Sequence, residues 1–407
     1  MKGKINVSNE LIIKNLYVNK ALSSTELSLR IKKSLPVTIQ LLNTLLEEGY
    51  VIETGYARST GGRKPVNYAI NPGIMYVISV AMDQYVTRIA LMNMKNEFLT
   101  PVAKYELPLL NNNGALELLI EKIEQVINKS GIPKAKFAGI GIGMPGFVDI
   151  KKGLNHTYLF TEGQSIAEYI SGKINLPVFI DNDSSIIALA ELKFGAARDT
   201  KDAMVVNVGW GIGLGLILNG ELYEGHNGFA GEFSHIPLLF NGKLCSCGKS
   251  GCLETEASLL IVVAKAIEGL RVGQITKLKE LPEDDLGQAL QKTIKAAHEG
   301  DRFAIGLLSE SGYTIGRGVA ILIHIFNPEF VILSGRGSAA GKILVTPLQQ
   351  AINEYCIPSL AEHTSIRISE LGEDAELIGA AALVMENYEK EEANVKVNLH
   401  KIEIGAN

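Results

Sequence analysis

The chain has 407 residues, 46% of them hydrophobic and 20% charged, and its formal net charge at pH 7 is −5. These values indicate a globular protein with a large core and two or three domains. No run of about 18 apolar residues is present, and the first residues lack the apolar stretch of a signal peptide. This excludes a membrane-spanning helix and a secreted protein of that kind, so we expect a soluble cytoplasmic protein with no membrane partner.

The charge is unevenly distributed along the chain. Residues 1–72 carry ten Lys and Arg against five Asp and Glu, a net +5, whereas the remaining residues carry 29 against 39, a net −10. A small basic module on a large acidic body is typical of a protein that binds a polyanion through one domain only. We therefore expect a DNA-binding domain over 1–72, a larger domain over 73–385, and a charged tail over 386–407.

Residues 9–50 show apolar positions at helical spacing, which predicts three short helices. Ser23 and Glu26 form a candidate capping box for the second helix, and Ser34 before Pro36 is a candidate N-cap for the third. Gly49 should end the third helix. The strand that begins at Val51 should pair with residues 65–70 across a glycine-rich turn, which predicts a winged helix-turn-helix.

In such a fold the third helix enters the major groove of operator DNA and the wing reaches the minor groove. A helical module that serves only dimerisation or domain packing is the alternative, but the cationic glycine-rich wing argues against it. The third helix carries no Lys or Arg, so affinity would depend on the preceding turn and the wing. The candidate DNA contacts are Val37, Gln40 and Asn43 on the third helix, Lys32 and Lys33 before it, and Arg63 and Lys64 in the wing.

From Ile74 onward, apolar strands alternate with amphipathic helices, which predicts an α/β architecture with helices covering the sheets. Glycine-rich turns follow candidate strands at 139–146, 209–215 and 334–337. Such turns bring backbone N–H groups close to a ligand, although glycine also serves ordinary turns. His324 lies in the apolar run 320–326 and is expected to be buried.

One histidine and three closely spaced cysteines are the most specific feature of the sequence. The motif Gly231-Glu-Phe-Ser-His235 is followed by Cys245, Cys247 and Cys252 within eight positions. One imidazole and three thiolates complete a tetrahedral zinc site with no open position, so the zinc would be structural. Separate buried cysteines beside a surface histidine are the alternative, which the tight spacing disfavours.

These motifs, together with the Asp181-Asn182-Asp183 turn and Gly141-Ile-Gly-Met-Pro-Gly146, resemble the ROK family of repressors, open reading frames and sugar kinases. The resemblance covers about residues 9–385, and the basic module resembles the head of the repressor branch. It implies an actin-like (ribonuclease H-like) two-lobed sugar-kinase fold, with sugar in the cleft, behind an α+β winged helix-turn-helix domain. Lobe one would span about 73–190 plus the C-terminal helix, and lobe two about 191–370.

The resemblance also implies roles for individual residues. Asn182, Glu232, His235 and Glu254 would hydrogen-bond sugar hydroxyls, Gly146 would close the pocket, and Asp183 would match the general base of the kinases. Carboxylates and amides suit vicinal hydroxyls, and a carboxylate beside the reacting oxygen suits phosphoryl transfer. A plain loop with a helix cap is the alternative for the Asp-Asn-Asp turn.

Two phosphate-binding loops depart from the pattern of the kinases. Kinases of this family have Asp-x-Gly-Gly-Thr after the first strand, where this chain has Asp83-Gln84-Tyr85. They also have Gly-Thr-Gly-Ile-Gly where this chain has Trp210 in place of the threonine. We therefore expect no enzyme activity, with Asp183 a vestigial base in a sugar sensor.

The expected function is a sugar-responsive DNA-binding regulator, most simply a repressor of carbohydrate-use genes, that acts as a homodimer or homotetramer. One alternative is an active glucokinase-like sugar kinase that carries a DNA-binding head. Another is a zinc-stabilised interaction protein with no ligand.

Overall fold

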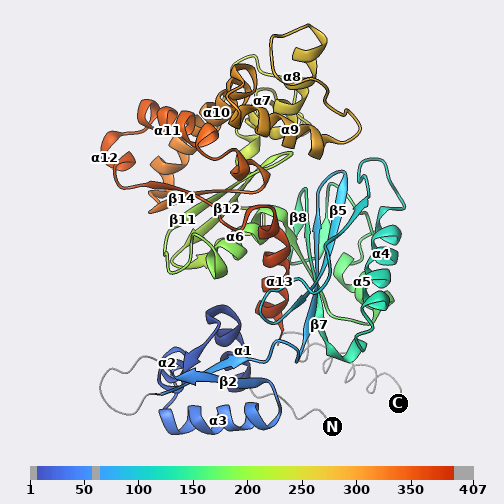
Figure 1. Ribbon diagram of the computed structural model, residues 1–407, viewed down its shortest axis with the longest axis vertical. Helices are drawn as coiled ribbons and strands as arrows, with labels where there is room; N and C mark the ends of the chain where they lie inside the picture. Colours follow the sequence, from blue (N-terminus) through green and yellow to red (C-terminus); the bar gives the residue numbers. More distant parts are fainter. Residues whose placement is uncertain (1–6, 57–64, 389–407) are drawn as a thin grey trace. The chain divides into compact units, whose positions relative to one another are not determined.

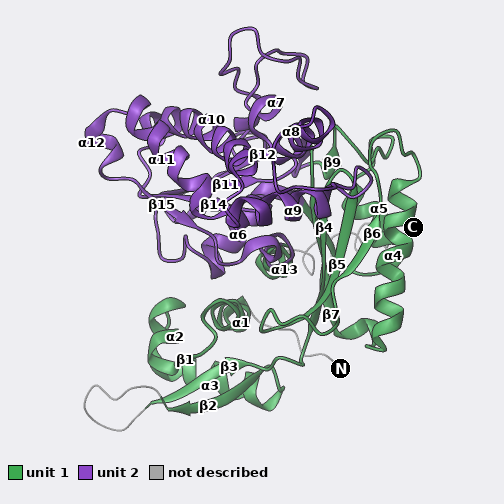
Figure 2. Cartoon of the chain, turned by 45° about the horizontal axis from the view of Figure 1, so that its top comes forward, with its two compact units in different colours: residues 1–146, 152–180, 380–407 green, residues 147–151, 181–379 purple. Residues whose placement is uncertain are grey.

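The structure is a computed structural model that describes residues 7–56 and 65–388. The wing residues Arg63 and Lys64 and almost all of the charged tail therefore lie outside the described residues. The chain divides into two compact units (Figure 2). The first unit comprises Met1–Gly146, Lys152–Ile180 and Ala380–Asn407, and the second comprises Phe147–Lys151 and Asp181–Gly379.

The N-terminal part of the first unit contains the three predicted helices and the predicted hairpin. The hairpin strands pair antiparallel with Val51 opposite Ile70, and a short strand that the sequence did not predict adds to the other edge. The sheet order is β1-β3-β2. The elements are α1 (Val7–Asn19), β1 (Leu22–Ser23), α2 (Ser24–Arg30), α3 (Leu35–Glu47), β2 (Val51–Tyr56) and β3 (Val66–Ile70).

The ends of these helices follow the sequence signals in part. The capping box of α2 is complete, because the Ser23 side chain accepts from the Glu26 N–H and the Glu26 carboxylate accepts from the Ser23 N–H. Gly49 follows α3 in the left-handed conformation at φ +78°, as a terminating glycine should. Ser34 occupies the N-cap position of α3, but its hydroxyl makes no capping hydrogen bond.

The rest of the first unit is a five-stranded sheet of order β10-β7-β4-β5-β6, with helices on both faces (Figure 1). Helix α13 packs closely on β7, since a Cβ at Gly141 would lie 2.0 Å from the Ala380 carbonyl oxygen. The elements are β4 (Tyr76–Met82), β5 (Val86–Asn93), β6 (Ala103–Glu106), α4 (Ala115–Ser130), η1 (Lys134–Lys136), β7 (Phe137–Met144), β9 (Leu154–Asn155), α5 (Ile166–Ile174), β10 (Val178–Asn182) and α13 (Ala375–Asn387).

The second unit is built around another five-stranded sheet, of order β13-β12-β11-β14-β15. Strands β11, β14 and β15 are parallel to one another, and β12 and β13 are antiparallel additions at one edge. The strands are β8 (Val148–Asp149), β11 (Ala203–Val208), β12 (Ile212–Leu218), β13 (Glu221–Leu222), β14 (Phe330–Ser334) and β15 (Ser365–Ile368). The helices are α6 (Asp183–Phe194), η2 (Phe233–His235), α7 (Glu254–Ala257), α8 (Leu259–Arg271), α9 (Leu286–His298), α10 (Arg302–Phe326), η3 (Arg336–Ala340), α11 (Lys342–Tyr355), α12 (Pro358–Ala361) and η4 (Gly372–Asp374).

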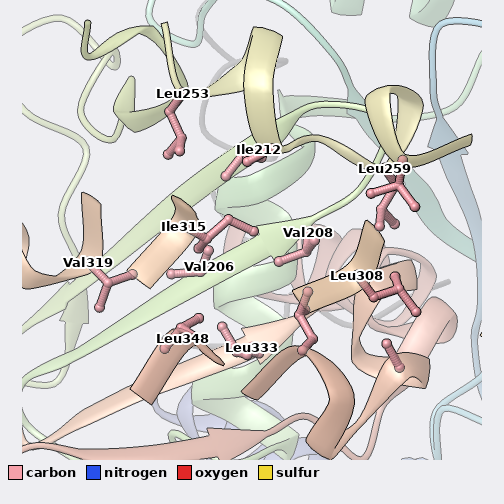
Figure 3. Close-up of a cluster of buried hydrophobic side chains, with 14 of the residues drawn as sticks. Val206, Val208, Ile212, Leu253, Leu259, Leu308, Ile315, Val319, Leu333 and Leu348 are labelled. Carbon is pink, nitrogen blue, oxygen red and sulfur yellow. The ribbon is translucent and has the colours of Figure 1, made fainter. Parts of the chain in front are cut away.

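The central strands β11 and β14 of this second sheet are buried on both faces, to which successive residues point in turn. Val205 and Ile332 belong to a core cluster with α6, whereas Val206 and Leu333 belong to a larger cluster with α8–α11. Figure 3 shows part of the larger cluster, where the strands meet Leu308 of α10. The alternating α/β pattern predicted from the sequence is therefore present, with helices on both sides of the sheet.

Two expectations need correction in this part of the fold. Helix α6 groups with the second unit rather than with the first lobe, because it packs on β12: a Cβ at Gly215 would lie 2.2 Å from the Ala188 Cβ. His324 is exposed on α10 rather than buried, and its Nε2 accepts a hydrogen bond from the Ile357 N–H. Within residues 7–56 and 65–388, no helix is long and apolar enough to cross a membrane.

Candidate functional site

The predicted DNA-reading residues of α3 all lie on its exposed face. Val37, Gln40 and Asn43 are exposed, while the opposite face buries Thr38, Leu42 and Leu45 against the rest of the head. Lys32 and Lys33, in the turn between α2 and α3, are exposed as well, and Lys32 has φ +54°. The exposed face of α3 thus presents the amides of Gln40 and Asn43 beside apolar Val37, and a helix with one free face has the form needed to enter a major groove.

In the second unit, His235, Cys245, Cys247 and Cys252 come together as a group that could hold a metal ion. Their four ligand atoms all lie within 4.8 Å of one another. The Cys245 Sγ is 3.5 Å from the His235 Nδ1, and the Cys247 and Cys252 Sγ atoms are 3.6 Å apart. A tetrahedral site with ordinary Zn–S and Zn–N bonds has edges of about 3.6 to 3.8 Å. The four residues therefore fit a zinc ion.

The loop between the cysteines is shaped by its backbone. The Cys245 N–H donates to the Lys249 carbonyl at 2.7 Å, and the Gly248 N–H donates to the Cys245 carbonyl at 2.9 Å. Gly248 and Gly251 have φ of +84° and +78°, and a Cβ at Gly251 would lie 2.0 Å from the Leu239 carbonyl oxygen. The two glycines of the motif thus permit the turn that brings the thiols together.

Next to this cluster lies a group of carboxylates. The Glu232 Oε2 is 3.8 Å from the His235 Nε2, on the ring edge opposite the cysteines. Burial raises the pKa of Glu232 to about 7, and the charges of Asp183 and Glu254 add to that rise. Burial also raises the pKa of Glu254, while the charge of His235 and a hydrogen bond from Ser234 lower it. The structure therefore brings Glu232, His235 and Glu254, three residues predicted to contact sugar hydroxyls, close to Asp183, the predicted vestigial base.

The Asp-Asn-Asp turn joins β10 to α6. Asn182 is the N-cap of α6, and its side-chain oxygen accepts from the Ser184 N–H at 2.9 Å, so the simple capping role is real. The Asp183 carboxylate accepts from the same N–H at 2.7 Å. Asp181 is only 3% exposed, and burial raises its pKa to about 7; the nearby Asn182 N–H lowers it, and the charges of Glu224 and Asp183 raise it.

Gly146 belongs to the first unit, so its position relative to these residues is not described. It has φ +90°, and a Cβ there would lie 2.7 Å from the Thr157 Cβ. Both facts exclude a larger residue at this turn without local strain. The role of Gly146 in closing a sugar pocket stays a prediction.

The altered phosphate loops are occupied by the protein itself. In the first unit, the Asp83 carboxylate accepts from the N–H groups of Tyr85 and Val86, each at 2.8 Å, and so closes the β4–β5 turn. In the second unit, Trp210 is 8% exposed and the Arg336 guanidinium lies 5.1 Å from its ring centroid. No sequence signal predicted that Arg336, in the third glycine-rich turn, packs on Trp210.

Sequence reasoning also missed the aromatic contact to the candidate metal ligand. The Phe147 ring stacks on the His235 imidazole, with centroids 5.8 Å apart and planes 21° apart. The edge of Phe229 completes the group, with ring centroids 6.2 Å apart and planes at 89°. The only available signal was that Phe147 directly follows Gly146.

The α/β scaffold, with one histidine and three cysteines beside a group of carboxylates, can be compared with those of known proteins. The chain belongs to the ROK family, whose model matches residues 82–387. Solved structures share its actin-like fold. The ROK transcriptional regulator described as a homologue of the E. coli MLC protein has a TM-score of 0.75 at 24% identity and covers 93% of this chain and 96% of its own. The ROK glucokinase from Streptomyces griseus, solved with glucose and AMPPNP, has a TM-score of 0.64 at 25% identity and covers 76% and 98%.

Relatives by sequence include both repressors and kinases. The xylose repressor of Caldicellulosiruptor bescii is 31% identical over 385 residues, which are 93% of this chain and 95% of the repressor. The DNA-binding transcriptional dual regulator NagC of Escherichia coli K12 is 29% identical over 85% of this chain and 84% of its own. The glucokinase of Halalkalibacterium halodurans is 34% identical but covers 70% of this chain and 88% of its own.

Proposed function

We propose that the protein is a sugar-responsive DNA-binding transcriptional regulator, most simply a repressor of carbohydrate-use genes. The observation that carries this proposal is the exposed face of α3 with Gln40 and Asn43, in a head of three helices and a β-hairpin that the same chain joins to a ROK domain. Similarity to xylose repressors extends over 93% of the chain and so includes the head. Binding to operator DNA places the regulator in the cytoplasm.

The ligand of the ROK domain is a sugar or sugar derivative. Asp183, Glu232, His235 and Glu254 supply acceptors and a ring nitrogen in one part of the second unit. Asn182 adds an amide to the proposed sugar set, and Gly146 stays a predicted member of it. Paired polar groups of this kind recognise vicinal hydroxyls by accepting and donating in turn. The metal is a structural zinc ion, since the imidazole and three thiolates leave no position for substrate.

The domain does not use ATP in this proposal. A nucleotide phosphate needs backbone N–H groups and a hydroxyl at the second glycine-rich loop, where Trp210 stands instead. Arg336 lies over the indole ring, and its Nε is 3.7 Å from the Glu373 carboxylate. Two side chains from different loops thus pack together at the second glycine-rich loop, which supports a sensor rather than an enzyme.

Helix α13 offers a physical link between ligand and DNA. It runs from the second unit into the first at Gly379–Ala380. At one end it packs on α6, because a Cβ at Gly379 would lie 2.0 Å from the Ile186 carbonyl oxygen. At its other end the Glu386 carbonyl accepts from the Lys14 ammonium of α1 at 2.8 Å. A sugar that binds more tightly to one arrangement of α6 would favour that arrangement. In a dimer or tetramer, this would shift the equilibrium between positions of the DNA-binding heads.

The test is a crossed pair of variants. Operator fragments are first selected from genomic DNA with the full-length protein, and binding is then measured by fluorescence anisotropy with D-xylose, D-glucose, N-acetylglucosamine and their phosphates. We expect one of these ligands to change operator affinity. Gln40→Ala should weaken DNA binding and leave sugar binding intact, whereas Glu254→Gln should bind operator and lose the response to sugar. A protein that selects no operator, or a response unchanged in Glu254→Gln, would contradict the proposal.

An active sugar kinase that carries a DNA-binding head is the second candidate, because Asp183, the position of the kinase base, is retained at the start of α6. A coupled assay with ATP and Mg²⁺ across the same sugars separates the two. Turnover that disappears in Asp183→Asn would establish the kinase.

If no sugar stabilises the protein against heating, the ligand-free interaction protein is favoured instead.

A further inference from the structure

The orientation of the His235 ring requires an explanation beyond metal binding. Its Nδ1 faces the Cys245 Sγ at 3.5 Å, and its Nε2 faces the Glu232 carboxylate at 3.8 Å. A metal ion fixes one ring nitrogen but leaves the imidazole free to rotate about the bond to that metal. In metal sites the plane of such a ring is set by contacts outside the ligand set, and those contacts strongly affect affinity or activity.

The local backbone restrains the imidazole only weakly. His235 ends η2, a single turn of three residues whose N-cap side chain makes no capping bond. The backbone itself is fixed upstream, since Gly231 has φ +95° and a Cβ there would lie 2.1 Å from the Leu214 carbonyl oxygen. The Cys252 Sγ lies 3.5 Å from the His235 carbonyl oxygen, but that contact does not involve the ring.

The Phe147 ring supplies the missing restraint. It lies nearly parallel to the imidazole, and Phe229 approaches it edge-on, so both rotation and sliding of the phenyl ring are opposed. Phe147 belongs to Phe147–Lys151, a short segment that groups with the second unit although both flanking stretches group with the first. The far end of this segment is anchored too, because the Lys151 ammonium donates to the His226 carbonyl at 2.6 Å.

We propose that Phe147 is a positioning residue of the ligand site: its ring fixes the plane of the His235 imidazole, so that Nε2–H stays directed at Glu232 while Nδ1 binds the metal. This inference rests on the ligand site and the zinc ion proposed above, and it assigns a role to a residue outside both sets. The imidazole Nε2–H attracts the Glu232 carboxylate across 3.8 Å, without a direct hydrogen bond, and that carboxylate accepts from a sugar hydroxyl in the proposed site. The segment that carries Phe147 begins directly after Gly146, so one stretch of chain supplies both the turn and the ring.

The experiment uses the zinc-loaded full-length protein labelled with ¹⁵N-histidine, without sugar. Long-range ¹H–¹⁵N spectra distinguish a metal-bound nitrogen from a protonated one, and the exchange rate of the Nε2–H reports its protection. Phe147→Leu keeps apolar bulk but removes the flat ring. We expect it to retain zinc bound at Nδ1 and to exchange the Nε2–H about tenfold faster than the parent. Phe147→Tyr, which restores a ring, should return the parent rate.

Phe240→Leu is the matched control, because Phe240 lies fully exposed on the loop before the cysteines and the same change there should alter nothing. If Phe147→Leu does not fold, Phe147→Met replaces it with the same expectations. Unchanged exchange in the Leu or Met variant overturns the inference, and so does loss of zinc, which would make Phe147 a support of the metal loop. A Tyr variant that behaves like Leu overturns it as well.

Sugar affinity is measured in a second arm by calorimetry, with the ligand that the panel identifies. We expect about tenfold weaker binding in Phe147→Leu and recovery in Phe147→Tyr. If the parent binds no sugar of the panel, the proposed function fails while the exchange rates still decide the role of Phe147. If the parent binds sugar and the exchange rate does not respond to Phe147→Leu, the positioning role alone fails.

Discussion

Asp181 provides a stability test that depends chiefly on burial. Its carboxyl group is 3% exposed at the end of β10, and its pKa rises from 3.8 to about 7, chiefly by burial. Because the folded protein holds the proton more tightly than the unfolded chain does, this group favours folding at low pH. That contribution declines between about pH 4 and pH 7 and is absent above. A rise of about three pKa units corresponds to about 4 kcal/mol at most.

Asp181→Asn removes the titration and keeps an oxygen that can accept from the Asn182 N–H. The unfolding free energy of the variant should therefore rise relative to that of the parent as pH rises. The difference between the two should grow by about 3 kcal/mol between pH 5 and pH 8 and then stay constant. Urea unfolding followed by fluorescence measures this, because Trp210 is the single tryptophan and lies in the same unit. Asp199→Asn, at an exposed turn, is the control. A gap that is constant with pH would refute the reasoning.

Three further predictions concern the metal, the DNA and the link between units. Cys247→Ser should lose zinc and lower the melting temperature of the second unit, measured by metal content and calorimetry; equal metal content would contradict the assigned ligand set. Lys33→Ala should weaken operator binding and reduce the salt slope of log K by about one, whereas an unchanged slope would remove Lys33 from the phosphate contacts. Gly379→Ala should destabilise the protein by at least about 1 to 3 kcal/mol in urea unfolding, because its Cβ would overlap the Ile186 carbonyl oxygen; unchanged stability would show that α13 moves freely there.

Short-range signals in the sequence predicted local structure well. The capping box at Ser23 and Glu26 depends on residues three apart, and the cysteine spacing confines three ligands to one loop. His235 is ten residues from the first cysteine, close enough for the motif to suggest it. In each case the residues are so close in sequence that the chain allows few arrangements. The order of residue types therefore predicts where the side chains lie.

Contacts between distant segments could not be predicted in this way. Phe147 reaches His235 across 88 positions, and Arg336 reaches Trp210 across 126. These pairs depend on how strands and loops pack, and neither residue type is unusual for its local sequence. The exposure of His324 has the same origin, since an apolar run on a helix covers the core with only one face. Packing, rather than composition, decides which side chain of such a run is buried.

The proposed loss of nucleotide binding and the proposed retention of the sugar site place opposite demands on neighbouring loops. A kinase must leave Gly209–Gly213 open for phosphate, yet here the indole of Trp210 is buried under Arg336. The same loop must still pass close to the sugar site, because a Cβ at Gly211 would lie 2.8 Å from the Glu254 Oε2. In this proposal the replacement of the threonine by Trp210 removes a phosphate contact without displacing Glu254, provided that Gly211 stays glycine. A loop of this form can lose phosphoryl transfer and keep ligand recognition, which is what a sensor derived from a kinase scaffold requires.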